Sequence, residues 1–296
     1  MSENRGPRFP QIVSYDRVPK NLLINPGFEI WQRGAGPFTT HYTFSADEWL
    51  LNISSGTLSV ARSTSALFGD YCASMTVGGA GVGNIGQGIE VYKSLEDAWV
   101  TFSVWVNAPV GVSVWITLGS YPNGVDYTPV VGTGTWQQAV VTRNMGSGLT
   151  GHGSWPHSYG AVAQVQCNEN ATVLVDGAVL AVGYFPEGLM YRPPNPAQDM
   201  LRCERYYQKS DAANWASRTM WTGKCTSGSV YYMNMPFSTK MAAVPTISVT
   251  NYSSGSFPAT ASSTWCNGTQ GFWFGRTANA TNNRGFFGDI WSAEVP

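Results

Sequence analysis

The sequence predicts an all-β protein, in which a jelly-roll β-sandwich is followed by a short helix and a smaller C-terminal β-sandwich. Segments with alternating apolar and polar residues recur from residue 21 to about residue 190. No helix-period segment of useful length interrupts them, and strand-like segments resume after about residue 212. Several short antiparallel strands within about 170 residues are typical of a sandwich. The predicted parts are an extended N-terminal arm (1–20), the jelly roll (21–192), a linker helix (193–210) and the C-terminal β-domain (211–296).

The composition is poor in charge and rich in aromatic residues. Of the 296 residues, 12% are charged and 13% are aromatic, whereas about a quarter of the residues in ordinary domains are charged. The net charge is −1, so the sequence lacks the excess of basic residues that is typical of a nucleic-acid-binding protein. No apolar run approaches the roughly 20 residues of a membrane span, and no signal-peptide core is present. We therefore expect no nucleic-acid partner and no membrane insertion.

Residues 1–20 contain three prolines and four basic residues without usable periodicity. Two interpretations stay open: a disordered tail, or an extended arm that becomes ordered only on a neighbouring subunit. The second interpretation is the one that we carry forward, with the arm as the attachment point of the folded body.

The folded part opens with NLLINPGFEIWQRG (21–34), which we interpret as a first strand. An aliphatic run, Leu22 to Ile24, meets an Asn-Pro-Gly turn and continues into an aromatic and acidic stretch. Further strands of the jelly roll are predicted at GTLSVARS, YCASMTV, WQQAVVTR, AVAQVQC and ATVLVDGAVLAVG.

Two segments show the two-residue period most clearly. In WVTFSVWVN (99–107) and VSVWITLGSY (112–121), aliphatic residues and Phe alternate with Trp, Tyr, Ser and Thr. We predict a hairpin across the turn NAPVG that places Trp105 opposite Trp115 and both aliphatic faces on the core side. The other face would then carry four large aromatic side chains: Trp99, Trp105, Trp115 and Tyr121.

This aromatic face has two interpretations. Aromatic rings stack on the apolar faces of sugar rings, while neighbouring Ser, Thr and Asn side chains bond the sugar hydroxyls. Trp and Tyr are also enriched at protein–protein interfaces. We favour burial against another subunit or element over an open glycan platform, and both stay predictions.

YRPPNPAQDMLRCERYYQKS (191–210) interrupts the strands. Asn195 suits a helix cap, Pro196 suits the first helical position, and Gln198 completes a capping-box-like spacing. The sequence therefore predicts one helix of about 14 residues that joins two β-modules. The predicted apolar stripe of this helix consists of Ala197, Met200, Cys203 and Tyr207.

The C-terminal strands are predicted at GSVYYMNMPFS, TISVTNYS, GFWFGR and GFFGDIWSAEV. This module of about 85 residues is short for an independent core, and it holds more aromatic residues than one small sheet can bury. Oligomerisation would bury the surplus, so we predict a homo-oligomer. The residues concerned are Trp265, Phe272, Trp273, Phe274, Phe286, Phe287 and Trp291.

The remaining motifs favour structural roles. GVGNIG (81–86) matches a GxGxxG spacing but lies between two β-segments, which indicates a strand connection. His152 and His157 lack further metal ligands. Asp47 and Glu48 suit a turn and an anchor of the sandwich better than a glycosidase pair. The five dispersed cysteines predict free buried thiols. We predict no catalytic residues and no enzyme activity.

The opening segment, SADEWLL (45–51) and VLVDGAVLAVG (173–183) together resemble carbohydrate-binding jelly-roll modules. Those modules begin with N-(L/I)-x-x-(G/P)-x-F-E and close with (V/I)-D-x-(V/A)-x-L. The version with EIWQRG and ADEW is similar to copies in tailed-bacteriophage virion proteins. MLRCERYYQKS, MPFSTKMAAVPTISVT and the aromatic-Gly C-terminus resemble the distal portion of phage tail-fibre proteins. The literal matches cover about a fifth of the chain.

In these sugar-binding modules, the Glu of the first motif and the Asp of the last commonly share a structural calcium ion. The resemblance assigns those positions to Glu29 and Asp176, with a backbone carbonyl near Gly27 as a third ligand. Ca²⁺ takes several oxygen ligands at about 2.3–2.6 Å and would pin the first strand to the last. The alternative is that both carboxylates cap turns by accepting hydrogen bonds from backbone N–H groups.

The resemblance implies a structural or adhesion component of a bacteriophage virion, made in the host cytoplasm and carried on the extracellular particle. We expect a trimeric short tail fibre or tip protein that contacts host surface polysaccharide and attaches to other virion proteins through its arm. Two alternatives stay open: a capsid decoration protein of the cement or head-fibre type, and a secreted carbohydrate-binding module. No cofactor is expected beyond the structural Ca²⁺.

Overall fold

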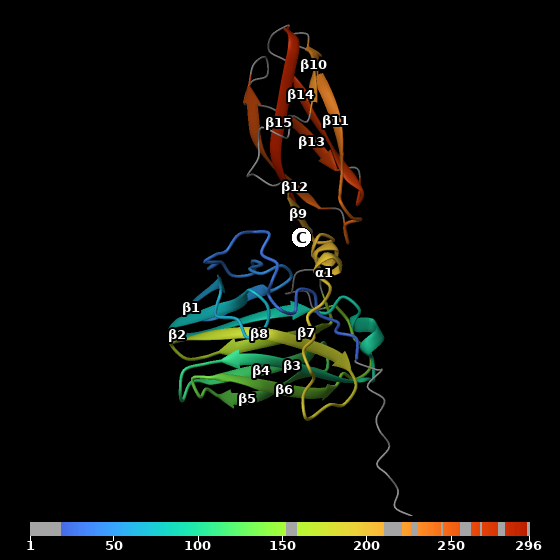
Figure 1. Cartoon of the computed structure of the whole chain (residues 1–296). Coiled ribbons are helices and arrows are strands. Elements are labelled where there is room, and N and C mark those ends of the chain that lie inside the picture. The colour runs from blue at the N-terminus through green and yellow to red at the C-terminus, as the bar shows by residue number, and fades with distance from the viewer. Residues whose placement is uncertain are drawn as a thin grey trace, which may run out of the picture.

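The computed structural model describes residues 19–151, 159–209, 221–225, 230–243, 245–254, 262–266, 268–277 and 282–294. A larger β-sandwich, the body, is connected by helix α1 (Pro196–Cys203) and the short strand β9 (Tyr207–Lys209) to a smaller C-terminal β-module (Figure 1). No helix in the described part of the chain has the length and apolar character needed to cross a bilayer. The all-β prediction is confirmed.

The strands of the body agree closely with the alternating segments of the sequence. The prediction at 99–107 coincides with β3, and the predictions at 161–167 and 171–183 coincide with β7 and β8 to within one residue. One body strand, β5, was not predicted. The body strands are β1 (Leu50–Ser63), β2 (Cys72–Gly88), β3 (Trp99–Asn107), β4 (Ser113–Ser120), β5 (Gly124–Val131), β6 (Trp136–Asn144), β7 (Ala161–Cys167) and β8 (Ala171–Val182).

These strands form one hydrogen-bonded sheet that folds over into two layers. Its order is β5-β4-β7-β2-β8-β3-β6, and β1 also pairs with β2. The long strand β2 belongs to both layers, because residues 83–88 pair with β7 whereas residues 73–77 pair with β8. The apolar side chains of both layers meet in one core, which includes Met75, Ile85, Phe102, Val104, Ile116, Leu118, Val165 and Val175.

The predicted hairpin between residues 99–107 and 112–121 is wrong. β3 pairs with β6 and β8, whereas β4 pairs with β5 and β7. Trp105 therefore lies opposite Gln138 and Asp176, and Trp115 lies opposite Pro129 and Gln166. The turn after β3 crosses from one layer to the other. Alternation specifies which side of a strand faces the core, and it carries no information on which strand lies alongside.

The β1–β2 pair bends where the two layers join, at a cluster of glycines. The register shifts on both sides of Ser55, and Gly56 has a φ of +66°. A Cβ on Gly56 would lie 2.4 Å from the Cα of Gly81 and 2.6 Å from the carbonyl oxygen of Gly78. The motif GVGNIG lies within β2 at this bend, so its prediction as a connection between strands is wrong, and its glycines serve the packing of one continuous strand.

We expect Gly56→Ala to lower the free energy of unfolding by about 2–4 kcal/mol, because the new methyl group meets backbone atoms and the backbone is left-handed. Gly79→Ala is the matched control. Gly79 has nearly the same φ, +67°, but nothing lies within 4 Å of its added Cβ, so only about 1 kcal/mol of backbone strain is expected. Urea denaturation of both variants measures the difference. Equal losses in the two variants would contradict the close approach.

The opening segment is not a strand, contrary to the sequence prediction. Asn25 and Phe28 have φ values of 49° and 56°, and such left-handed residues interrupt a strand ladder. The segment is still tied to β8, because the Leu22 N–H donates to the Leu180 carbonyl at 2.9 Å. The carbonyl of Asn25 accepts a hydrogen bond from the buried indole of Trp49 at 3.0 Å. The segment thus closes one end of the body.

Helix α1 is shorter than predicted and buries a different face. It spans eight residues, with Asn195 as its cap and Pro196 as its first residue, as predicted. Its buried residues are Asp199 and Cys203, whereas Met200 is 37% exposed. Of the predicted apolar stripe, only Cys203 is buried, whereas Ala197 and Met200 are exposed. The Asp199 carboxylate accepts a hydrogen bond from the Asn25 backbone N–H at 3.2 Å, so a polar contact places this acidic residue inside.

The C-terminal module consists of two small sheets. One has the order β10-β15-β12 with β9 also paired to β15, and the other has the order β11-β14-β13. The four predicted C-terminal strands are confirmed as β11, β12, β14 and β15. The structure does not describe the side chains of the aromatic residues that were predicted to be too many for this module to bury. The predicted oligomer therefore stays a prediction. The strand bounds are β10 (Trp221–Cys225), β11 (Val230–Pro236), β12 (Thr246–Ser254), β13 (Ser262–Cys266), β14 (Gly271–Thr277) and β15 (Asn282–Glu294).

Candidate functional site

The two outer faces of the body differ in what lies over them. The β6–β3–β8 face is covered by the segment 183–191, which we call the strap. The Gln138 side chain on β6 donates a hydrogen bond to the Leu189 carbonyl at 2.7 Å, and the Phe185 N–H donates to the Thr101 hydroxyl at 3.0 Å. A second apolar cluster lies between the strap and β8. The strap therefore occupies this face beside Gln138 and Thr101, and we call it the covered face.

Two of the four predicted aromatic residues belong to the covered side. Trp105 is half-buried against Phe68, with ring centroids 6.0 Å apart. Trp99, at the start of β3, is 47% exposed and packs edge-on against Tyr184 of the strap. Trp115 and Tyr121 belong to the other layer. The predicted single aromatic face is therefore wrong, because consecutive strands lie in opposite layers and their outward sides diverge.

Within the described part of the chain, the β5–β4–β7 face is open, and it carries aromatic rings beside polar side chains. Trp115 and Tyr127 pack edge-to-face with ring centroids 5.2 Å apart, and Tyr127 is 62% exposed. Next to them on β4 and β7, the Thr117 hydroxyl donates to the side-chain oxygen of Gln164 at 3.0 Å. The backbone register places Gln166 beside Trp115. We call these five residues the open face.

A hollow of about 200 Å³ extends the open face toward the turn after β4. Tyr121 lies at its edge and is 46% exposed. Beneath the turn, the Arg143 guanidinium donates hydrogen bonds to Asp126 at 2.6 Å and to Ser120 at 3.2 Å, which holds β5 and the turn in place. The walls are lined by Gly119, Tyr121, Val125, Tyr159, Val162 and Gln164.

Sequence reasoning selected Trp115 and Tyr121 of this site and missed its other members. Tyr127 was missed because β5 was not predicted, although its sequence, GVDYTPVV, alternates as a strand does. Gln164 and Gln166 fall on the polar positions of AVAQVQC, which was predicted as a strand but not as part of a site. Rings next to amides and hydroxyls match the chemistry of a sugar, which presents both C–H surface and hydroxyl groups.

Glu29 and Asp176 both hold the loop between β1 and β2. The Asp176 carboxylate accepts hydrogen bonds from the N–H groups of Leu67 and Phe68, each at 2.8 Å. The Glu29 carboxylate accepts from the N–H groups of Asp70 and Tyr71 at 2.9 and 3.1 Å. Both carboxylates therefore accept hydrogen bonds from backbone N–H groups of the loop, as the alternative interpretation predicted.

The same residues fit a calcium ion only in part. Burial raises the pKa of Asp176 to about 6, its backbone hydrogen bonds act in the opposite direction, and the Glu29 charge adds to the rise. A cation would relieve that repulsion. However, one oxygen of each carboxylate already accepts hydrogen bonds from two N–H groups. In addition, the described residues contain no group of three or more His, Cys, Asp or Glu side chains that could hold a metal ion. Calcium binding at Glu29 and Asp176 stays a prediction.

Asp47 and Glu48 lie inside the molecule, where the body meets the C-terminal module. Asp47 is 1% exposed and Glu48 is 4% exposed. Arg33 forms an ion pair with Asp47 at 3.1 Å and a second one with Glu294 of β15 at 2.9 Å. The turn that holds them is closed by a hydrogen bond from the Trp49 N–H to the Ala46 carbonyl. Both acidic residues thus act as structural anchors, as the sequence indicated.

The other candidate ligands have structural roles or lie outside the description. His41 accepts a hydrogen bond from the Ile53 N–H through its Nδ1 at 2.9 Å, whereas His152 and His157 lie outside the described residues. Cys72, Cys167 and Cys203 are buried free thiols, which confirms the prediction for these three. The side chains of the remaining two cysteines are not described.

No protein-family model and no curated protein matches the chain. Among solved structures, the chain is similar to TmCBM61 in complex with β-1,4-galactotriose, with 17% identity, 55% of this chain and 99% of that chain covered, and a TM-score of 0.38. The xylan-binding domain CBM22-1 of Paenibacillus barcinonensis Xyn10C matches with 13% identity, 56% and 96% coverage, and a TM-score of 0.37. The enzymatically active domain of bacteriophage CBA120 tailspike protein 4 matches with 12% identity, 55% and 21% coverage, and a TM-score of 0.39. The fold described above rests on the strand order and register of this chain.

Proposed function

We propose that this protein binds glycans through the open face of its body. The observation that carries the proposal is the Trp115–Tyr127 ring pair, in which Tyr127 is exposed and Trp115 is half-buried, with the Thr117–Gln164 hydrogen-bonded pair and Gln166 beside it. The rings offer apolar contact to a sugar ring, and the amide groups of Gln164 and Gln166 offer donors and acceptors to its hydroxyls. The rigid strands of the sheet hold these groups in place before a ligand arrives, which lowers the entropic cost of binding.

The wider role that we propose is a structural and adhesion component of a tailed-bacteriophage virion. The resemblance of residues 21–34, 200–210 and 235–250 to phage virion and tail-fibre proteins supports this role. In this proposal the protein is a trimeric short tail fibre or tip, its N-terminal arm attaches to other virion proteins, and the open face contacts host surface polysaccharide. Capsid decoration is the alternative placement. No catalytic step is proposed.

Trp115→Ala is expected to lower glycan affinity at least about tenfold, because a central aromatic anchor contributes more to binding than its neighbours. A glycan array identifies the ligand, and calorimetry on the best hit measures the change. Trp99→Ala is the matched control, since Trp99 is a half-exposed tryptophan on the other side of the body.

The mass of each variant in solution separates the two interpretations of Trp115. Loss of glycan binding with an unchanged oligomer supports the proposal. Loss of assembly in Trp115→Ala, with glycan binding retained by the remaining protein, contradicts it and makes the open face a subunit interface. Equal effects of Trp115→Ala and Trp99→Ala would also contradict a site on the open face.

A further inference from the structure

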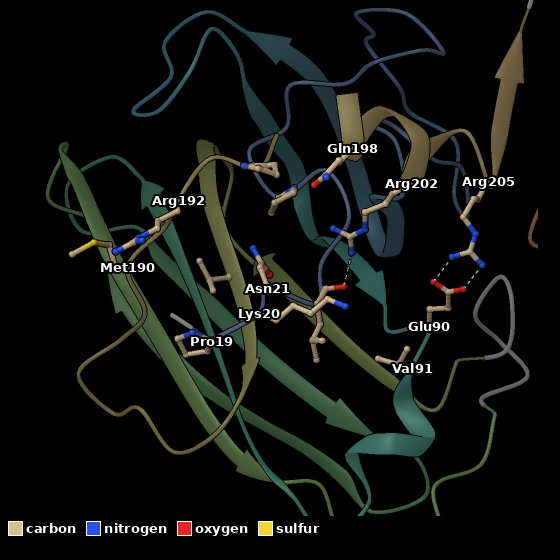
Figure 2. Close-up of a pocket in the computed structure, with 14 residues that line it drawn as sticks. Pro19, Lys20, Asn21, Glu90, Val91, Met190, Arg192, Gln198, Arg202 and Arg205 are labelled. Carbon is tan, nitrogen blue, oxygen red and sulfur yellow. Dashed lines mark hydrogen bonds and ion pairs between the residues drawn. The ribbon is translucent and has the colours of Figure 1, made fainter. Parts of the chain in front are cut away.

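A groove of about 660 Å³ lies on the body where three segments of the chain meet. Residues 19–22 form its floor, the end of the strap and the residues that follow it form one wall, and helix α1 forms the other (Figure 2). Its volume falls in the range of about 300–1,000 Å³ that is usual for small-molecule sites. Four basic side chains line it: Lys20, Arg192, Arg202 and Arg205.

Two of these positive charges have no partner in the described part of the chain. Arg205 forms a two-pronged contact with Glu90 at 2.6 and 3.1 Å, and Arg202 lies 3.7 Å from the carboxylate of Asp199. Among the described residues, neither Lys20 nor Arg192 takes part in an ion pair, and both are exposed. Among the described residues that line the groove, Glu90 is the only acidic one, so this described lining carries a net positive charge in a protein of net charge −1.

The groove also exposes apolar surface next to these charges. Met190 is 75% exposed and Val91 is 45% exposed, and Figure 2 shows Met190 beside Arg192 and Val91 beside Glu90. The Arg202 guanidinium is fixed by a hydrogen bond to the Leu22 carbonyl at 3.2 Å, so the floor and the α1 wall are joined. The ligand that fits has an anionic group for the cations and an apolar surface for the walls.

We infer that the groove binds an organic oxyanion, either a carboxylate or a phosphate ester, whose body offers apolar surface to the walls. Guanidinium groups match the geometry of both anions, and the Lys20 ammonium adds a point charge. Lys20 on the floor and Arg192 beside Met190 each offer a positive charge to the oxyanion, while Met190 and Val91 offer apolar contact to the rest of the ligand. The site is separate from the open face, so this inference does not depend on the proposed function.

Calorimetry of the full chain with trigalacturonate tests the inference, with its uncharged methyl ester and inorganic phosphate as the comparison ligands. We expect trigalacturonate to bind at least about tenfold more tightly than the ester, since hydrogen bonds to charged groups are the stronger ones. Lys20→Gln and Arg192→Gln together should remove that preference. Lys240→Gln and Arg62→Gln, which remove exposed charges elsewhere, should leave it unchanged.

The comparison ligands distinguish the source of the oxyanion. If inorganic phosphate binds and the Lys20→Gln/Arg192→Gln pair abolishes its binding, whereas trigalacturonate does not bind, the site takes phosphate-bearing ligands. Equal affinity for the acid and the ester, or an acid affinity that the double variant leaves unchanged, overturns the inference. Trp115→Ala separates this result from the open face, because it should leave the binding of the anionic ligand intact.

Discussion

Replacement of Arg33 by alanine is expected to lower the free energy of unfolding by about 3–5 kcal/mol, the usual cost of removing one partner from a buried ion pair. Arg33 is 11% exposed and Asp47, its partner in the body, is 1% exposed. The variant leaves the Asp47 carboxylate buried without the guanidinium that compensates its charge. This single side chain therefore stabilises the junction more than surface ion pairs stabilise other parts of the chain.

The contacts of Arg33 also tie the C-terminal module to the body. Its guanidinium lies 4.0 Å from the ring centroid of Tyr207, close to the start of β9. It also donates hydrogen bonds to Glu294 at the end of β15 at 2.9 and 3.2 Å. Tyr207 and Glu294 are Cα partners in the sheet of the module. Loss of Arg33 should therefore loosen the module as well as destabilise the body.

Urea denaturation followed by tryptophan fluorescence measures the stability of the Arg33→Ala variant, and limited proteolysis measures release of the module. Glu294→Gln is the matched partner variant. Because Glu294 is 44% exposed, its loss should cost at most about 1 kcal/mol. Arg62→Ala, an exposed arginine that packs on Tyr71, gives the effect of an ordinary surface change. An Arg33→Ala loss no larger than that of Arg62→Ala would refute the anchoring role.

Glu48→Gln is expected to make the protein more stable than the wild type at pH 8. Burial raises the pKa of Glu48 from 4.5 to about 8, the Arg33 charge acts in the opposite direction, and the charges of Asp47, Glu90 and Glu294 add to the rise. Glu48 is therefore protonated in the folded protein at pH values where it is ionised in the unfolded chain. The glutamine side chain has nearly the same shape and carries no charge at any pH.

The sign of the pH dependence follows from the proton count of the two states. Between pH 4.5 and about 8 the folded state holds one more proton than the unfolded state, so the stability falls as the pH rises. The stabilising effect is complete below pH 4.5 and is lost by about pH 8. At about 1.4 kcal/mol for each pKa unit, this change amounts to a loss on the order of 5 kcal/mol.

Chemical denaturation at pH values from 4 to 9 measures this slope. Glu187→Gln, on the exposed part of the strap, should retain the wild-type slope. Glu48→Gln should retain the part of the slope at lower pH that Asp176 and Asp199 contribute, because burial raises the pKa of both carboxyl groups in the same direction. A wild-type slope above pH 6 in the Glu48→Gln variant would show that another group titrates there.

The local alternation of apolar and polar residues was sufficient to predict the positions of most strands. It did not predict which strands lie next to each other in the sheet. β3 coincides with its predicted segment because a two-residue alternation is set by which side chains face the core. β5 was missed because its segment begins at Gly124 and contains Pro129, and proline is tolerated in a strand mainly at a sheet edge. β5 lies at the end of the strand order, and edge position is a property of the assembled sheet.

The candidate site was found in part for the same reason. Trp115 and Tyr121 were chosen because aromatic residues stood on the polar side of a strand. Their true neighbours, Tyr127 and Gln164, come from strands that the sequence did not place beside β4. Likewise, Asp199 was not assigned to the buried face of α1, since an acidic residue is normally exposed unless a partner compensates it. Its partner, the Asn25 N–H, is 174 residues away in the chain.

The sequence alone determined the all-β class, the core-facing side of most strands and the cap of α1, because these features depend on residues a few positions apart in the chain. The tertiary structure alone decided that β3 and β4 lie in opposite layers, that the strap covers the β6–β3–β8 face, and that the β5–β4–β7 face stays open. It also decided that Arg33, Asp47 and Glu294 meet at one junction. These features depend on contacts between segments far apart in the chain, and alternation along a strand does not encode which distant segment will pack against it.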